Sequence, residues 1–335
     1  MRHGPDGCDA YASGWGRNDV TGRGLMGEFY RDYADYLAER FEGKVQKLTV
    51  NAGFSCPNRD GTLGRGGCVY CNNVSFSPQI AGGDVVRQLE EGKHFFARKY
   101  PRMRYLAYFQ SYTNTHGPID DLMELYARAA GVEGVVGIII GTRPDCVPDG
   151  LLDRLAGLPV PVMMEYGAET SHDSTLAAIN RCHTWAQTVD AVERTVARGI
   201  DVGLHFIMGL PGETRAMMLE TVRRAAALPV STVKFHQLQI IAGTPLAREA
   251  VWNENKSRAT FRGLPVHLFT VEEYVELCVE VVQELRRVNP GVAIERFTSQ
   301  APEGLLVAPR WGLKNYQFVN LLTNRLRQIE TDELF

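Results

Sequence analysis

The sequence lacks an apolar run of about 18 residues, which is the length that a membrane-spanning helix needs. It also lacks the charged start and short apolar segment of a secretory signal peptide. Both absences argue against a membrane protein and against export. We therefore expect a cytoplasmic protein that has no membrane partner.

Excess positive charge is also missing, since 36 Lys and Arg residues face 39 Asp and Glu residues, for a net charge of −3. A general affinity for nucleic acid is thus not expected, and an RNA contact would need a local basic patch. The seven cysteines are an odd number in 335 residues, which argues against a disulfide scaffold and favours reduced thiols. Hydrophobic residues at 44% are ordinary for a globular protein of one large or two modest domains.

Three of the cysteines lie in one stretch, from Asn51 to Ser77. They have the spacing C-x11-C-x2-C and are Cys56, Cys68 and Cys71. Between them stand Pro57, Gly61, Gly64, Gly66 and Gly67. Glycines let a loop approach a bound group closely, and thiolates on such a loop are typical metal ligands.

The number of ligands bears on which metal this stretch holds. A zinc ribbon needs a fourth ligand, but no second C-x2-C is present, and His94 and His116 lie in segments with other predicted structures. Three thiolates suit a [4Fe–4S] cluster with one iron open for S-adenosylmethionine, whose reductive cleavage gives a 5′-deoxyadenosyl radical. Spacing alone does not choose the metal, so a zinc site stays open at this point.

Strand and helix patterns alternate along most of the chain. The predicted strands span residues 44–51, 104–110, 134–141, 160–166, 201–208 and 233–241. An amphipathic helix at 28–41 precedes them, and the helices between them span residues 83–99, 119–130, 148–155, 171–180, 184–198 and 213–228. This order predicts parallel βαβ units, arranged as a partial barrel or an open sheet.

The C-terminal part has a different pattern. A helix at 270–288 begins with a capping box of Thr270 and Glu273, and its apolar stripe includes Cys278 as a core thiol. A strand at 292–297 and a helix at 314–329 follow. We divide the chain into a disordered leader, a core and a C-terminal α/β extension packed on the core, at residues 1–25, 26–243 and 244–335.

The cysteine stretch, with Tyr70 just before its last cysteine, resembles the radical SAM enzymes. After KVQKLTVNAGFSCPNRDGTLGRGGCVYC come the motifs YFQSYTNT, GTRPDC, INRCH and GLPGET. In this order they resemble a bacterial branch related to the radical SAM domain of the elongator catalytic subunit and to tRNA wobble-uridine modification. The resemblance covers the chain from about residue 28 to the C-terminal tail.

This resemblance implies a partial (β/α)6 TIM-like barrel with S-adenosylmethionine and a [4Fe–4S] cluster as cofactors. It implies that Cys56, Cys68 and Cys71 hold the cluster and that Tyr70 lies at the cofactor. The implied partners are a tRNA substrate and an electron donor such as flavodoxin or ferredoxin. The elongator's acetyl transfer is not carried over, because we expect no second domain for it in this chain.

Polar motifs follow the predicted strands, where βα barrels collect their working residues. Gln110 and Thr113 belong to a polar loop that we expect to bind the cofactor. Arg143 can hold a carboxylate and Asp145 a ribose hydroxyl, or both can form structural ion pairs with neighbouring loops. Cys146 fits best as a small packed residue.

Two glutamates, Glu165 and Glu169, follow the next strand. The resemblance implies a carboxylate here that engages the methionine part or ribose of the cofactor, and it implies that Arg181 clamps the cofactor carboxylate. Relatives more often have Gln at the position of Glu169, so we expect Glu165 to be the ligand; the alternative is that Glu165 is buried against Arg181. His183 is a candidate for orienting the substrate, and Cys182 has no assigned role.

The last candidates lie further along the chain. His205 opens the HFIMGLPGET segment, which the resemblance places near the adenine. Lys234 and His236 alternate on one strand face and are candidate substrate contacts if that face lines the barrel. Arg296 and the basic segment 308–315 are candidate RNA contacts, where Trp311 stacks a base or else anchors a surface loop.

These observations predict a radical SAM enzyme that abstracts hydrogen from a substrate at the barrel mouth, with a tRNA wobble uridine as the substrate hypothesis. Radical chemistry on a small metabolite or peptide is the alternative within the same class. A non-catalytic zinc- or RNA-binding protein is the alternative outside it.

Overall fold

A computed structural model of the protein describes residues 27, 29–72, 83–97, 100, 102–110, 112–253 and 258–332. The predicted leader, Ser111 and the end of the cysteine-rich stretch, residues 73–77, lie outside the described residues. Within the described ranges, no helix has both the length and the apolar content that crossing a bilayer requires.

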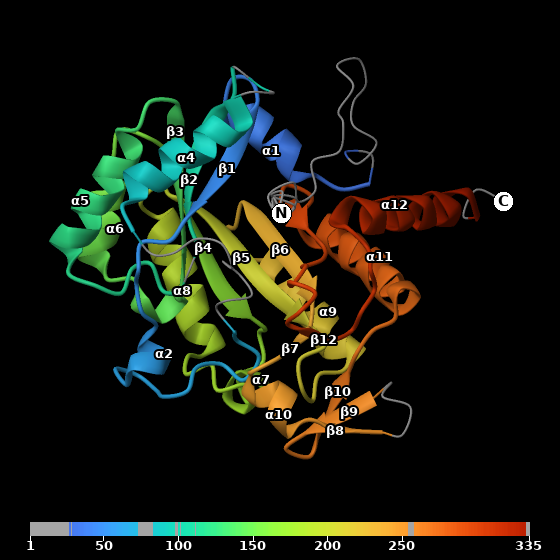
Figure 1. The fold of residues 1–335 in the computed structure, drawn as a ribbon. Coiled ribbons are helices and arrows are strands. Elements are labelled where there is room, and N and C mark those ends of the chain that lie inside the picture. Colours follow the sequence, from blue (N-terminus) through green and yellow to red (C-terminus); the bar gives the residue numbers. More distant parts are fainter. Residues whose placement is uncertain are drawn as a thin grey trace, which may run out of the picture.

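A seven-stranded sheet forms the centre of the molecule, in the order β1-β2-β3-β4-β5-β6-β11. All neighbouring strands in it are parallel. The strands are β1 (Val45–Val50), β2 (Arg104–Phe109), β3 (Val135–Thr142), β4 (Val162–Glu169), β5 (Asp201–Met208), β6 (Thr232–Gln237) and β11 (Ala293–Arg296). The sheet is curled into a partial barrel, which confirms the predicted fold class (Figure 1).

Helices cover the outer face of this sheet because its strands are apolar on that side as well. Helices α4, α5 and α8 pack directly on strands, and α9 packs against α11. Their bounds are α4 (Val85–Ala97), α5 (Ile119–Ala130), α6 (Asp149–Leu155), α8 (Trp185–Val196), α9 (Arg215–Ala226) and α11 (Val271–Val288). In Figure 1, α5 and α6 lie at one side of the sheet, and α11 with α12 (Asn315–Asp332) lies at the other.

Helix α1 (Tyr33–Arg40) closes the inner side of the barrel at the N-terminal ends of the strands. Its Tyr36 and Arg40 side chains donate hydrogen bonds to Asp201, the first residue of β5, at 2.9 and 2.8 Å. Its apolar face packs on inward residues of β2, β3, β4 and β11. The predicted helix at 28–41 is thus shorter than expected, because Asp32 caps its start.

Several predicted boundaries were wrong. The strand predicted at 233–241 is divided into β6 and β7 (Ile240–Ile241), and the helix predicted at 171–180 is α7 (Asp173–Ala178). The seventh strand of the sheet, β11, comes from the region assigned to the extension. This strand pairs with β6 and covers the edge of β6 that a six-stranded sheet would leave open.

The region after β7 is also more ordered than its polar sequence indicated. It contains helix α10 (Pro245–Glu249) and a small antiparallel sheet of β8 (Val251–Trp252), β9 (Arg258–Phe261) and β10 (Leu264–His267). A second small pair joins β7 to β12 (Leu306–Ala308). The capping box of Thr270 and Glu273 is confirmed at α11, and Cys278 is buried in the core as predicted.

Candidate functional site

The cysteine loop lies at the C-terminal edge of the sheet, next to α7, α10 and the small sheet (Figure 1). It leaves β1 and forms a single helical turn, α2 (Pro57–Asp60), in which the N–H groups of Arg59 and Asp60 donate to the carbonyl of Cys56. The N–H of Cys71 donates to the carbonyl of Cys68 at 3.0 Å. Backbone hydrogen bonds within the loop therefore fix its conformation.

Asn58 joins this loop to the segment that follows α7. Its side chain is fully buried, and its amide nitrogen donates to the carbonyl of Asn180 at 2.5 Å and lies 3.8 Å from the Cys68 sulfur. The Cys182 thiol donates to the Asn58 side-chain oxygen at 3.1 Å. A Cβ at Gly64 would lie 2.3 Å from the same oxygen, so this packing requires glycine there.

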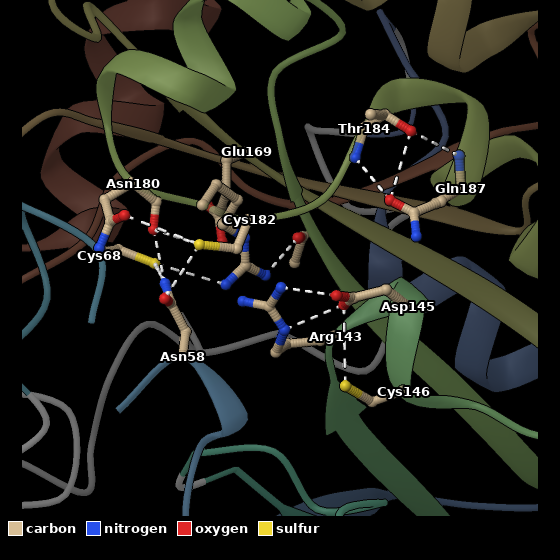
Figure 2. A network of polar contacts seen from close by, with 12 residues as sticks. Asn58, Cys68, Arg143, Asp145, Cys146, Glu169, Asn180, Cys182, Thr184 and Gln187 are labelled. Atoms are coloured by element: carbon tan, nitrogen blue, oxygen red, sulfur yellow. Dashed lines mark hydrogen bonds and ion pairs between the residues drawn. The ribbon is translucent and has the colours of Figure 1, made fainter. Parts of the chain in front are cut away.

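Arg181 places a positive charge beside the sulfur of Cys68, a residue that Figure 2 shows in one polar network with Asn58 and Asn180. Its Nη1 lies 3.6 Å from Cys68 Sγ, and its Nη2 donates to the carbonyl of Gly167 at 2.6 Å and lies 3.5 Å from Glu169. A cation in this position stabilises a thiolate. Burial raises the pKa of Glu169, although Arg181 acts in the opposite direction. Tyr70 is buried in the same place.

Arg143 and Asp145 form a two-pronged ion pair with each other, at 2.9 and 2.7 Å. The guanidinium is 2% exposed, and its Nη1 has no hydrogen-bond partner in the described part of the chain. Cys146 lies next to the pair, 3.8 Å from an Asp145 oxygen, and burial raises its pKa to about 12. Two nitrogens of the Arg143 guanidinium, Nε and Nη2, are thus engaged by Asp145, while Nη1 remains a free donor among the described residues.

Buried polar atoms without a partner gather in these same loops. Among the described residues they include the Thr113 hydroxyl, Arg143 Nη1, Arg181 Nε and both ring nitrogens of His183. Burial, followed by the charges of Arg181 and Arg143, lowers the pKa of His183 to about 2. Burying unsatisfied polar atoms is costly, so their concentration here indicates a site for a polar ligand.

Backbone strain also concentrates near the site. Of the five described non-glycine residues with positive φ, four lie in the loops just described or beside them, namely Tyr112, Glu169, Asn180 and Cys182. Such conformations cost free energy and persist where the surrounding contacts impose them.

The arrangement of the three thiols is compatible with an iron–sulfur cluster. Within the described residues, no three His, Cys, Asp or Glu side chains converge on a point where one metal ion would sit. In a [4Fe–4S] cluster each thiolate binds a separate iron, so the three sulfurs need not converge. The loop, the cation beside Cys68 and the unsatisfied donors around it therefore fit a cluster and a polar cofactor.

Glu165 does not lie against Arg181, so that alternative for it was wrong. Its carboxylate is buried and accepts hydrogen bonds from Lys47 at 2.9 Å, Lys234 at 2.9 Å and His205 at 2.8 Å. Burial alone would raise the pKa of Glu165, but the two lysines and the histidine hold it well below its usual value. Glu169, not Glu165, is the carboxylate beside Arg181.

Glu295 of β11 completes this inner layer by accepting from Lys47 at 2.6 Å and pairing with Lys234 at 3.0 Å. His205 thus faces the barrel interior, and burial lowers its pKa to about 4. We call Lys47, Glu165, His205, Lys234 and Glu295 the inner charge layer. Lys47 and Glu295 were not among the predicted site residues, and the signal that could have found them was a charged side chain within a short predicted strand.

The remaining candidate residues lie in two different parts of the fold. Gln110 and Thr113 follow β2 at the same edge as the cysteines, and His236 lies on β6 two residues after Lys234. Trp311 instead packs into the extension, where its ring stacks on Phe318 and its Nε1 donates to the carbonyl of Phe269 at 2.9 Å. Stacking on Phe318 supports the alternative in which Trp311 anchors this segment, and a base contact through the rest of the ring, which is partly exposed, stays a prediction.

Comparisons with known proteins agree with this geometry. Residues 56–225 match the Radical SAM superfamily, and residues 230–328 match the Radical_SAM C-terminal domain. The chain is 35% identical over 296 residues to YtqA of Bacillus subtilis, covering 87% of each chain. It is 37% identical over 279 residues to YhcC of Escherichia coli, covering 82% of this chain and 85% of that protein.

Among solved structures, the fold is similar to that of the archaeal Methanocaldococcus infernus Elp3, with a TM-score of 0.61 and 16% identity. The match covers 86% of this chain and 64% of that chain, so this protein spans less than two thirds of the Elp3 structure. At this identity the likeness shows the shared fold. The family match and the relatives at 35 and 37% identity show that the chain belongs to the radical SAM superfamily, whose cofactors are a [4Fe–4S] cluster and S-adenosylmethionine.

Proposed function

We propose that this protein takes a hydrogen atom from the wobble uridine of a tRNA as a step in modifying that base. The observation that carries the proposal is the set of motifs in which the chain resembles the elongator branch, in the same order. All of them except INRCH, which follows α7, lie at the C-terminal end of a strand. The fold shared with Elp3 supports it. When bound, the cluster supplies the electron that cleaves S-adenosylmethionine and so provides the 5′-deoxyadenosyl radical.

The chain's own residues have separable tasks in this reaction. Cys56, Cys68 and Cys71 would hold the cluster, and Arg181 stabilises negative charge at Cys68. Arg143, with one buried donor free, would bind the carboxylate of the cofactor. These groups lie in loops tied to each other by buried hydrogen bonds, which keeps the radical precursor in one position.

The remaining candidates would contact the rest of the cofactor. Thr113 has a buried hydroxyl without a partner, and Tyr70 is buried beside Glu169 and Arg181. Such groups suit the ribose and adenine, because they orient a polar ligand without adding charge. Water is kept from this region by the packing of α10 on the cysteine loop, where the N–H of Leu246 donates to the carbonyl of Val69.

Isotope transfer tests the substrate. The protein is reconstituted anaerobically with iron and sulfide, and then given dithionite, S-adenosylmethionine and a tRNA transcript made with deuterated uridine. We expect deuterium in the 5′-deoxyadenosine that is released. A transcript whose wobble uridine is replaced by cytidine is the matched control and should give unlabelled product.

The outcomes separate the two levels of the proposal. If 5′-deoxyadenosine forms at the same rate without RNA and never gains deuterium, the tRNA substrate is rejected while radical cleavage stands. If Cys68→Ala still forms 5′-deoxyadenosine, the ligand assignment itself is wrong.

A further inference from the structure

Arg296 is a cation without a partner on the inner face of the barrel. It is the last residue of β11 and pairs with Lys234 of β6 across a register shift at Ile294. The next residue, Phe297, packs outward against Phe235 and Tyr30. Glu295 is the extra residue at this register shift, so Arg296 follows it on the inner side of the sheet, where the charge of Arg296 acts on Lys234 and His236.

The charges around Arg296 are already balanced without it. The two carboxylates of the inner charge layer, Glu165 and Glu295, are both engaged by Lys47 and Lys234 at 2.6 to 3.0 Å. Among the described residues Arg296 has no hydrogen-bond or ion-pair partner, and its Nε is buried. One positive charge is therefore left over at this point, on a side chain that is partly exposed and can meet a bound anion.

The residues beside Arg296 do not supply the missing negative charge. Burial, followed by the charges of Arg296 and His205, lowers the pKa of His236 to about 3, so its ring is neutral. His205 is neutral as well, with a pKa of about 4. Neutral imidazoles can donate or accept a hydrogen bond to a ligand that Arg296 holds.

The position of Arg296 is well defined. Just beyond it, the Ser299 N–H donates to the Gln237 side-chain oxygen at 3.2 Å, and the Gln237 amide donates back to the Ser299 carbonyl at 3.3 Å. This pair fixes the end of β11 to the end of β6, at the edge of the sheet where the cysteine loop lies. A ligand at Arg296 is therefore held by a rigid part of the fold.

We propose that Arg296 binds a phosphodiester group of the RNA substrate, adjacent to the nucleoside that loses hydrogen. This inference rests on the proposed function and adds to it the group by which the substrate is positioned. A guanidinium binds the paired oxygens of a phosphate through its planar fork, which a lysine cannot reproduce. The neutral His205 and His236 rings then face the nucleoside rather than the phosphate.

Binding of an anticodon stem-loop RNA tests this, measured by fluorescence anisotropy over a range of salt concentrations with reconstituted protein. We expect Arg296→Gln to weaken binding at least about tenfold, as for loss of one hydrogen-bonded charge. The slope of log affinity against log salt should fall by about 1. The matched control is Arg215→Gln, which removes an arginine paired with Glu280 on the outer helices and should keep the affinity of the unchanged protein.

Further measurements of RNA affinity and of cofactor affinity identify the ligand of Arg296. An RNA with a neutral methylphosphonate at the contacted position should bind the unchanged protein about as weakly as Arg296→Gln binds the normal RNA, and Arg296→Gln should not respond to the replacement. The affinity for S-adenosylmethionine and its cleavage without RNA should be the same in both proteins. Weaker cofactor binding in Arg296→Gln, or an equal loss of RNA affinity in Arg215→Gln, would overturn the inference.

Failure of the RNA substrate is distinguishable from failure of the anion site. If the unchanged protein binds no RNA, inorganic phosphate is compared with chloride at equal ionic strength by thermal unfolding. Stabilisation by phosphate that Arg296→Gln loses supports the anion site and assigns it to a small phosphorylated substrate. If phosphate stabilises the unchanged protein and Arg296→Gln equally, the proposed anion site is wrong.

Discussion

Glu165→Gln is expected to destabilise the protein strongly, because this carboxylate holds the inner charge layer together. Glu165 is 1% exposed and accepts three hydrogen bonds of 2.8 to 2.9 Å from Lys47, Lys234 and His205. In the variant, two buried ammonium groups share Glu295 alone. Breaking a buried ion pair by removing one partner costs about 3 to 5 kcal/mol, so we expect a loss of this size in the free energy of unfolding.

The measurement is urea unfolding of the apoprotein at pH 7.5, followed by circular dichroism. The matched control, Glu280→Gln, removes a carboxylate that is paired with Arg215 at 3.0 Å but is 40% exposed, and it should cost less than about 1 kcal/mol. A Glu165→Gln variant no less stable than this control would refute the reasoning.

A double substitution tests whether the loss comes from charge imbalance. Glu165→Gln with Lys234→Met leaves one cation, Lys47, facing one anion, Glu295, at 2.6 Å. We expect the double variant to lose no more stability than either single variant, which is a coupling of at least about 3 kcal/mol. Additive losses would show that the layer does not act as a unit. If Glu165 binds the cofactor instead, the single variant keeps its stability and loses S-adenosylmethionine affinity.

Three further outcomes are expected. Cys68→Ala should lose the broad absorbance of the reconstituted cluster near about 400 nm, and an unchanged spectrum would contradict the ligand set. Gly167→Ala should reduce cofactor affinity by equilibrium dialysis, because its Cβ would lie 2.7 Å from Arg181 Nη2; unchanged affinity would show that the arginine can move freely. Glu213 is buried against Thr170, and burial raises its pKa to about 7 from 4.5. Because the folded protein then binds a proton that the unfolded chain has released, stability due to this group falls as pH rises from 4.5 to 7, by about 3 kcal/mol. Glu213→Gln should abolish that difference in urea unfolding across the pH range, and parallel curves for the two proteins would refute it.

Much of the fold follows from local patterns. The apolar run of β3 and the alternation of strands with helices predict parallel βαβ units, because a strand buried on both faces must be apolar throughout. The spacing of Cys56, Cys68 and Cys71 predicts the metal loop for a similar reason, since all three lie within one short segment. The capping box of Thr270 and Glu273 is equally local.

What local patterns could not show depends on which strands become neighbours. Glu165 lies 118 residues from Lys47 in the chain, so only the curl of the sheet brings their side chains together. The place of β11 is a second example. Its sequence predicts a short strand, but only the tertiary structure shows that this strand joins the central sheet next to β6. Trp311 lies in a basic segment of the sequence, and only the tertiary structure shows that its ring stacks on Phe318.

The sequence by itself therefore determined the chemistry that one loop can support and the order of strands and helices that carries it. Only the tertiary structure decided which charges neutralise one another inside the barrel and that Arg296 is left over. The physical reason is that periodicity reports which face of an element is buried, whereas charge balance depends on distances between residues far apart in the chain.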